Sequence, residues 1–347
     1  MLSRRDLNRT LLLRQHLLAR TAVPALEMVE HLVGLQAQEN LSPYLSLAAR
    51  LDGFDPEELS GALAGREAVR LLTLRGTIHV LTPDDALALR PWVQPALDRQ
   101  SNGSQMSRPA RDVPADDLVA ACRRLLAEGP LPATRLGELL AEAFPGVPAE
   151  ALAHKARERA PLVQVPPRGL WRQSGGVVYQ TVETYLGRPA APPDVSDLVR
   201  RYLRAYGPAT AADMTTWSRV TRLGPVFASL RDELVEVACE DGRTRYDVPG
   251  AQYADGEVPA PVRLLGGYDN VWLSHADRRH VLPDDVRARW TGPNGGAGNA
   301  VFVDGFMAGL WWHRDGRVEL ELFRDLTRAE RADLDDEVSR VETLLSR

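Results

Sequence analysis

Cysteine is scarce in this sequence. Cys122 and Cys239 are the only cysteines among 347 residues, and neither has a histidine or another cysteine at the spacing of a metal ligand. We therefore expect no zinc site, no iron–sulfur cluster and no disulfide framework. Nothing else in the sequence calls for a metal or a cofactor, so none is predicted.

Long apolar runs are also missing. No stretch approaches the roughly 18 apolar residues that a membrane span requires. The first twenty residues have a basic start and several leucines, but Arg14, Gln15 and His16 interrupt the apolar run and no small-residue cleavage site follows. We expect this segment to be a helix rather than a signal peptide, and the protein to be cytoplasmic with no membrane partner.

Lysine is almost absent. Lys155 is the only lysine, so arginine accounts for every other basic residue of the 42 present. A net charge of −5 does not favour nucleic-acid binding on average. Arginine, however, is the side chain that forks onto phosphates and enters narrow minor grooves. A GC-rich genome would produce the same bias, and this alternative stays open.

The composition is that of a folded chain with several domains. Hydrophobic residues make up 44% and charged residues 26%, which is ordinary for a globular protein. A chain of 347 residues is long enough for two to four modest domains.

The first hundred residues contain helical patterns followed by a hairpin. Apolar spacing predicts the first two helices, and a capping box beginning at Asp55 predicts the third. Two β-prone runs, 69–74 and 77–81, then flank a turn at Arg75 and Gly76. Helices followed by a two-stranded hairpin are the order of a winged helix.

This order recurs twice. Residues 123–134 and 200–210 both carry an amphipathic helix that ends in Gly-Pro before a threonine, and each is followed by further helical stretches and β-prone segments. Between these units, 101–113 and 187–195 are rich in Ser, Gly and Pro, as domain joints are.

The last ninety residues have a different pattern. Alternating apolar residues around Asp304-Gly305 and Asp315-Gly316 predict a β-meander, and a capping box at Thr327 predicts a closing helix. We therefore predict an α+β protein with three tandem winged-helix units and a β-rich module, at residues 1–105, 114–187, 195–255 and 256–347.

A glycine-rich segment, 290–300, interrupts this module. It lacks the Gly-Lys-Ser/Thr ending of a Walker loop and therefore does not predict a nucleotide phosphate site. A hairpin tip that probes a DNA groove and a disordered surface loop both remain open.

The segment GLQAQEN contains the best candidates for chemistry. Gln36 continues the helical spacing of Val29 and Val33, which predicts that it faces inward. A buried glutamine is costly unless its amide is hydrogen-bonded or faces a cavity. Gln38 lies about 200° further round a helix but on the same side of an extended segment, so both amides face one site only if the helix ends near Asn40. A helix end capped by the two amides is the alternative.

Three motifs together resemble one family. GLQAQEN, LRGTIHVLTPDD at 74–85 and YDNVWLSHADRRHVLP at 268–283 are similar to the AlkZ-like DNA glycosylases, which excise N7-alkylpurines and unhook interstrand crosslinks. The resemblance covers essentially the whole chain. It implies that the three winged helices form a C-shaped DNA cradle beside a β-barrel-like module. It also implies that the family's catalytic Gln-apolar-Gln motif falls on Gln36 and Gln38, as in the branch linked to self-resistance against DNA-alkylating natural products.

Two amides suit one kind of chemistry. An amide has no useful basicity, so the glutamines would hold a water molecule through their carbonyl oxygens and orient it at the anomeric carbon. Such a site serves only a good leaving group, and N7-alkylguanine or N3-alkyladenine qualifies because the base is positively charged. With no lysine placed to form a Schiff base, we predict monofunctional hydrolysis without strand cleavage. Crosslinked bases resist flipping, which favours an open cradle.

Four further residues are candidates through the resemblance. Arg75, Thr77 and His79 lie on or beside the first hairpin, where they would bind the DNA backbone or brace the glutamine segment. An ordinary turn and strand would contain the same residues. Arg278 would contact DNA, or would form a salt bridge with Asp277 that only holds the C-terminal module.

The predicted partner is double-stranded DNA with alkylated purines, bound by a monomer because three units in one chain span DNA without a second copy. The main alternative is a winged-helix transcriptional regulator without catalysis, which would dimerise on a palindromic site. A protein-interaction scaffold is a third, weaker interpretation.

Overall fold

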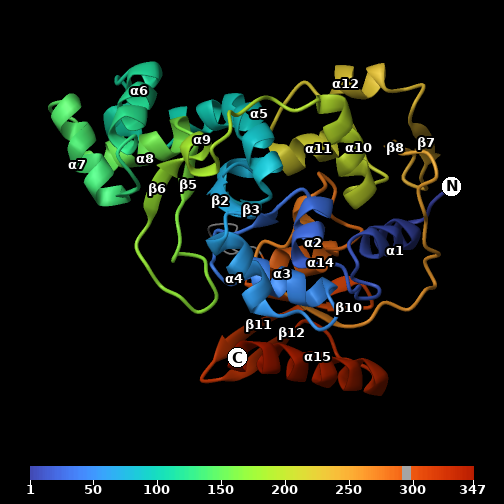
Figure 1. The fold of residues 1–347 in the computed structure, drawn as a ribbon. Coiled ribbons are helices and arrows are strands. Elements are labelled where there is room, and N and C mark those ends of the chain that lie inside the picture. The colour runs from blue at the N-terminus through green and yellow to red at the C-terminus, as the bar shows by residue number, and fades with distance from the viewer. Residues whose placement is uncertain (291–297) are drawn as a thin grey trace.

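The computed structural model describes residues 1–290 and 298–347 and has the predicted α+β architecture, with helices surrounding antiparallel sheets (Figure 1). Residues 291–297, which make up most of the predicted glycine-rich segment, lie outside the described residues.

The amino-terminal part begins with α1 (Arg4–Arg14) and continues as a helix, a short strand, two helices and two strands. These are α2 (Ala25–His31), β1 (Leu35–Gln36), α3 (Ser42–Arg50), α4 (Pro56–Ala64), β2 (Val69–Leu72) and β3 (Ile78–Leu81). Strand β3 lies between β1 and β2. The capping box predicted at Asp55 is not formed. Asp55 does cap α4, but the Glu58 carboxylate accepts from the Ala25 N–H at 2.7 Å and so caps α2 instead.

The second part repeats this order after the long helix α5 (Pro83–Asn102). Its elements are η2 (Arg108–Ala110), α6 (Ala115–Leu126), β4 (Leu131–Pro132), α7 (Ala133–Ala143), α8 (Ala149–Arg159), β5 (Leu162–Gln164), β6 (Val178–Thr181) and α9 (Val182–Leu186). Strand β6 lies between β5 and β4. Because β5 pairs with β2 at Val163 and Leu71, the hairpins of the two parts form one six-stranded sheet.

The segment 101–113, predicted to be a solvated joint, is docked on the second part. Ala110 is fully buried, and the Lys155 ammonium donates to the backbone oxygens of Ala110, Arg111 and Val113. These three acceptors enclose the only lysine of the chain and hold the segment against α8.

The third part has the same element order once more. It consists of α10 (Val195–Tyr206), α11 (Ala211–Ser218), α12 (Gly224–Ser229), β7 (Val235–Ala238) and β8 (Thr244–Asp247). Ala209, between α10 and α11, bridges to Tyr246 in β8 and so takes the place of the first short strand.

The C-terminal part contains the predicted meander. Its elements are β9 (Arg263–Leu265), α13 (Asn270–Leu273), α14 (Asp284–Trp290), β10 (Asn299–Val303), β11 (Phe306–Arg314), β12 (Arg317–Leu322) and α15 (Arg328–Ser346). Both Asp-Gly pairs have positive φ, as the tight hairpin turns require. The described strands form a sheet in the order β12-β11-β10-β9, and α15 contacts both edge strands. The barrel-like character that the resemblance implies for this module stays a prediction.

The hydrophobic core joins distant segments. One core draws most of its side chains from the first, third and C-terminal parts and a few from the second, such as Val163 and Trp171. The second part, which projects to one side in Figure 1, also has a smaller core of its own. The Tyr206 hydroxyl donates to the Leu32 oxygen at 2.6 Å, and Arg50 pairs with Asp269 inside this large core. The end of α2 is therefore held against α10, and α3 is held against the C-terminal part, close to the candidate site.

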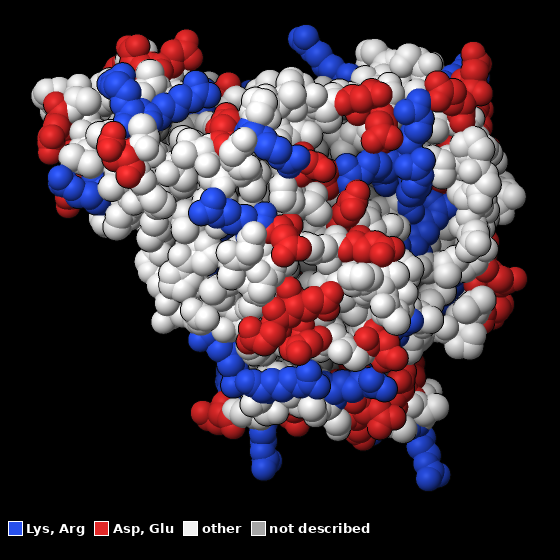
Figure 2. Space-filling view, viewed as in Figure 1, with Lys and Arg blue, Asp and Glu red and all other residues white. Residues whose placement is uncertain are grey.

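Charges of both signs are mixed over the face shown in Figure 2, with a denser basic group above α10. Two arginines of that helix are neutralised, because Arg200 pairs with Glu233 and Arg201 pairs with Asp85. Among the described helices, none combines the length and the apolar character needed to cross a lipid bilayer.

Candidate functional site

Gln36 lies on a strand and not on the predicted helix. Helix α2 ends at His31, and positive φ angles at Val33 and Gly34 turn the chain into β1. A side chain at Gly34 would lie 2.3 Å from a methyl group of Leu81, so only glycine fits this turn. The helical spacing of Gln36 in the sequence was therefore misleading. The alternative, a helix end capped by the two amides, is not observed either, because both amides bond elsewhere.

The amide of Gln36 is held by Arg75. Its Oε1 accepts from the Arg75 Nη2 at 3.0 Å, and the residue is only 7% exposed. The same guanidinium donates through Nη1 to the Trp217 carbonyl in α11 at 2.7 Å. Because a guanidinium only donates, the contact requires the amide oxygen, and not the amide nitrogen, to face Arg75.

Gln38 is exposed, and its side chain bonds to β3, the strand that pairs with β1. Its Oε1 accepts from the Ile78 N–H at 3.4 Å, while the Ala37 N–H donates to the Ile78 oxygen at 2.7 Å. The amide oxygens of Gln36 and Gln38 thus each accept from a donor belonging to the hairpin 74–79, and each oxygen keeps a second lone pair.

His79 is buried and neutral. Burial, followed by the nearby charge of Arg75, lowers the pKa of His79 from 6.5 to about 3. Its Nε2 lies 3.1 Å from the Arg75 Nη2 and its Nδ1 lies 3.0 Å from the Thr77 oxygen. Since Arg75 can only donate, Nε2 is the acceptor and the proton is on Nδ1. His79 therefore braces Arg75 and is fully enclosed.

Arg75 is a cation near other cations. Burial is the main cause that lowers its pKa to about 10, and the charges of Arg278 and Arg219 act in the same direction. The group is still charged at neutral pH. Thr77, the third candidate on this hairpin, donates through Oγ1 to the Leu74 oxygen at 3.2 Å, so its hydroxyl closes the turn.

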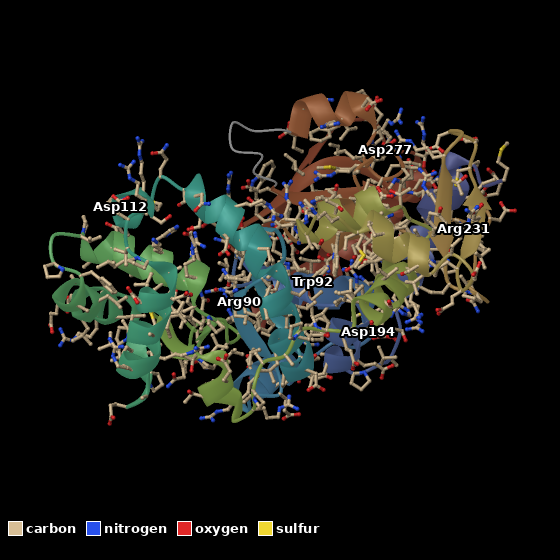
Figure 3. The ribbon with its side chains drawn as sticks, turned by 90° about the horizontal axis from the view of Figure 1, so that it is seen from above. Arg90, Trp92, Asp112, Asp194, Arg231 and Asp277 are labelled. Carbon is tan, nitrogen blue, oxygen red and sulfur yellow. The ribbon has the colours of Figure 1, made fainter. Side chains whose placement is uncertain are left out.

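The expected salt bridge between Asp277 and Arg278 is not formed. Asp277, labelled in Figure 3, pairs with Arg279 at 2.5 Å and with Arg243 at 3.5 Å. Burial, followed by the charges of Arg287 and Arg219, lowers the pKa of Arg278, and no carboxylate contributes to this shift. Among the described residues, the Arg278 side chain has no hydrogen-bond or ion-pair partner. It is an available cation beside Arg75, the residue that holds Gln36.

Sequence reasoning missed Arg70 and Asn40. The Arg70 Nη2 donates to the Ala37 oxygen and to the Asn40 Oδ1, both at 3.0 Å. Arg70 is buried in the β-prone run VRLL of β2. The sequence signal that could have identified Arg70 is a charged residue in the middle of an apolar strand, because a buried charge needs a specific partner.

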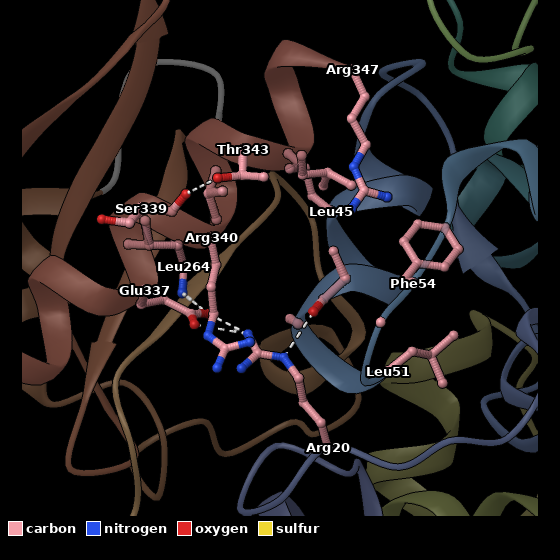
Figure 4. Close-up of a pocket in the computed structure, with 15 residues that line it drawn as sticks. Arg20, Leu45, Leu51, Phe54, Leu264, Glu337, Ser339, Arg340, Thr343 and Arg347 are labelled. Carbon is pink, nitrogen blue, oxygen red and sulfur yellow. Dashed lines mark hydrogen bonds and ion pairs between the residues drawn. The ribbon is translucent and has the colours of Figure 1, made fainter.

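The pocket in Figure 4 is a separate feature. It has a volume of about 310 Å³ and lies between α3, β9 and α15, where Arg20 pairs with Glu337. Gln36, Gln38 and Arg75 are not among the residues that line it. Within the described residues, no three His, Cys, Asp or Glu side chains gather as metal ligands would.

Comparisons with known proteins agree with one another. A family model described as "DNA glycosylase AlkZ-like" matches residues 29–344. A protein of Streptomyces sahachiroi, described as "Interstrand DNA cross-link repair glycosylase", is 26% identical over 344 residues, which cover 91% of this chain and 89% of that protein. The solved structure of Streptomyces sahachiroi DNA glycosylase AlkZ has a similar fold, with a TM-score of 0.76 at 24% identity over 99% of this chain and 97% of that chain.

Proposed function

The chain belongs to the AlkZ-like DNA glycosylase family, and from this premise we propose that it is a monofunctional glycosylase for cationic, N7-alkylated guanines in duplex DNA. N3-alkyladenines leave by the same chemistry. Bulky N7 adducts and interstrand crosslinks of DNA-alkylating natural products are included in the proposal, because the Streptomyces sahachiroi relative is described as a crosslink repair glycosylase.

The three similar parts are winged-helix units under this proposal. Each has the element order helix, short strand or bridge, two helices and two strands, with the last strand in the middle of the sheet. That order is the winged-helix order. Residues 1–105, 114–187 and 195–255 would together form the C-shaped cradle for DNA, with 256–347 as the C-terminal module. One chain then spans a duplex as a monomer.

The observation that carries the proposal is that both amide oxygens accept hydrogen bonds from the hairpin 74–79. Arg75 engages one lone pair of the Gln36 Oε1, and the Ile78 N–H engages one lone pair of the Gln38 Oε1. The remaining lone pairs can accept both hydrogens of one water molecule and direct its oxygen at the anomeric carbon. The same two carbonyl dipoles favour the positive charge that grows on the sugar.

The lesion supplies the driving force for bond breaking. The bond between the sugar and N9 breaks with its electron pair going to the base, which neutralises the positive charge of the alkylated ring. The water oxygen then bonds to the anomeric carbon and releases its proton to solvent. No general base is required, and His79, with a pKa of about 3, stays neutral beside Gln36 throughout the physiological range.

Strand cleavage is not expected. A lyase step needs an amine that attacks the sugar carbon, and Lys155 is the only lysine. Lys155 lies on α8 in the second part, and its ammonium is enclosed by the carbonyl oxygens of Ala110, Arg111 and Val113. The product of the proposed reaction is therefore an abasic site in an intact strand.

Release of free base tests the proposal. Duplexes that contain N7-methylguanine, a bulky N7 adduct or a crosslink are incubated with the protein, and both free base and strand integrity are measured. Free purine with an uncut strand supports the proposal. Binding to one defined sequence, with no base released from any of the three substrates, would instead identify a winged-helix regulator.

A further inference from the structure

Arg70 is a buried cation that pairs with no carboxylate of residues 1–290 or 298–347. Only 2% of the residue is exposed, and its two hydrogen bonds go to the Ala37 oxygen and the Asn40 side chain. In the described part of the chain, Nε and Nη1 of Arg70 have no acceptor. A buried guanidinium without a carboxylate is costly, so its contacts call for a specific explanation.

The strand ladder breaks where Arg70 binds. An antiparallel pair at Ala37 and Ile78 would exchange two backbone hydrogen bonds. One of them is present, from the Ala37 N–H to the Ile78 oxygen at 2.7 Å. The other is replaced. The Ala37 oxygen accepts from Arg70, and the Ile78 N–H donates to the Gln38 side chain.

The second part holds Arg70 in this position. Gly169, in the loop between β5 and β6, packs so closely that a side chain there would lie 2.5 Å from the Arg70 Cδ. The loop is fastened to the first part, because the Gly169 oxygen accepts from the Tyr44 hydroxyl at 2.7 Å and the Trp171 N–H donates to the Ser60 Oγ at 2.6 Å. The guanidinium therefore has little freedom to leave the Ala37 carbonyl.

We propose that Arg70 is a positioning residue for Gln38. By taking the Ala37 carbonyl out of the ladder, it leaves the Ile78 N–H free to fix the Gln38 amide, and the loop around Gly169 keeps it there. This role rests on the proposed function for its effect on the reaction, but its structural part does not. Without Arg70, the Ala37 oxygen returns to the ladder, and Gln38 loses the one hydrogen bond that its side chain makes within the described residues.

A double-mutant cycle tests whether Arg70 acts through Gln38. Arg70→Met should lower kcat by about ten- to a hundredfold and leave the Kd for lesion DNA within about twofold, because it changes orientation and not contact with the duplex. In a Gln38→Ala background, Arg70→Met should lower kcat by less than about threefold. Arg70→Lys, which keeps a donor near the Ala37 oxygen, should recover part of the rate.

Arg90 provides a matched control. It lies on α5 (Figure 3), is equally buried, and bonds through Nη2 to the Glu158 and Ala160 oxygens at 3.1 and 3.0 Å. Arg90→Met removes a similar buried guanidinium away from Gln38, so any effect on kcat should be additive with Gln38→Ala. Additive effects of Arg70→Met and Gln38→Ala would overturn the proposal.

Hydrogen exchange tests the structural part independently of catalysis. In the Arg70→Met variant, backbone exchange in residues 37–41 should change relative to the wild type, while Arg90→Met should leave this segment unaltered. If the wild type released no base, the proposed function would fail, and the exchange result would still decide the role of Arg70. Unchanged exchange over residues 37–41 in Arg70→Met would refute that role.

Discussion

The Arg75 guanidinium donates to the Gln36 amide oxygen at 3.0 Å and to the Trp217 carbonyl at 2.7 Å. One side chain thus ties a residue of the proposed catalytic pair to the third part of the chain. Arg75 lies in a tight turn and has a positive φ. Its guanidinium also donates to the Nε2 of the neutral His79. The orientation of Gln36 therefore depends on the packing of the first part against the third.

Replacing Arg75 should lower the rate of base release more than it lowers DNA binding. Without the guanidinium, the Gln36 amide can rotate, so Arg75→Met should reduce kcat by about ten- to a hundredfold. Arg75→Lys should not restore kcat, since one ammonium cannot reach both the Gln36 oxygen and the Trp217 oxygen as the two guanidinium nitrogens do. Single-turnover kinetics measures this effect. Arg66→Met is the control, because Arg66 also has a positive φ and bonds to a carbonyl, that of Tyr185. Equal losses in both variants would contradict a specific role for Arg75.

Neighbouring arginines at 278 and 279 should behave differently in DNA binding. Arg278 is the cation beside Arg75 that has no partner among the described residues, whereas Arg279 is paired with Asp277. Arg278→Ala should weaken duplex binding and reduce the slope of log K against log salt by about one, and Arg279→Ala should change the slope little. Titrations at several salt concentrations measure both slopes. Identical slopes for the wild type and Arg278→Ala would remove Arg278 from the DNA interface.

Acid should destabilise the fold through its buried histidines. The pKa values of His79 and His280 are about 3 when folded, mainly because of burial, against 6.5 for the ordinary group. The unfolded state therefore binds more protons between these values, and the free energy of unfolding falls as pH decreases from about 6.5 towards 3. His79 alone should account for about 2 kcal/mol between pH 7 and pH 5.

Denaturant unfolding at a series of pH values checks this expectation. In His79→Gln, which has no titrating group at this position, the free energy of unfolding should fall by about 2 kcal/mol less between pH 7 and pH 5 than in the wild type. The same slope in the variant and the wild type would mean that His79 is protonated in the folded protein.

A methyl group at Gly169 should disturb the site from the second part of the chain. Gly169→Ala places a Cβ 2.5 Å from the Arg70 side chain at a φ of +93°. We expect lower kcat together with lower stability. Gly187→Ala adds a Cβ at a similarly positive φ of +67° with nothing within 4 Å. It should therefore cost only the backbone strain of about 1–2 kcal/mol and leave kcat unchanged. Measuring kcat well below the melting temperature separates the effect on catalysis from the effect on stability. A Gly169→Ala variant with the wild-type kcat would argue against a link from Gly169 through Arg70 to the site.

Local signals in the sequence predicted several elements correctly. The hairpin around Arg75 and the two Asp-Gly turns are where the β-prone runs and turn residues indicate, because register and turn type depend on neighbouring residues. The third helix was predicted, but not the partner of Glu58, which caps a helix 33 residues earlier in the chain. Contacts of that kind depend on tertiary packing.

The sequence suggested residues for the candidate site but did not indicate the geometry around them. Gln36 matched a helical period by coincidence, and Gly34 was the overlooked sign that the helix ends before it. Local patterns also do not indicate that the first two hairpins pair into one sheet, or that Arg70 replaces a ladder bond at Ala37. Both features arise where segments distant in sequence meet.

The role of the two amides can be measured as the single-turnover rate of free-base release from a duplex with one N7-methylguanine, for the wild type and for Gln36→Ala/Gln38→Ala. If two oriented amides hold the attacking water, the double variant should be slower by about one to three orders of magnitude, each decade being about 1.4 kcal/mol, while the Kd for the duplex stays within about twofold. A double variant that releases the base at the wild-type rate would show that neither glutamine takes part in the reaction.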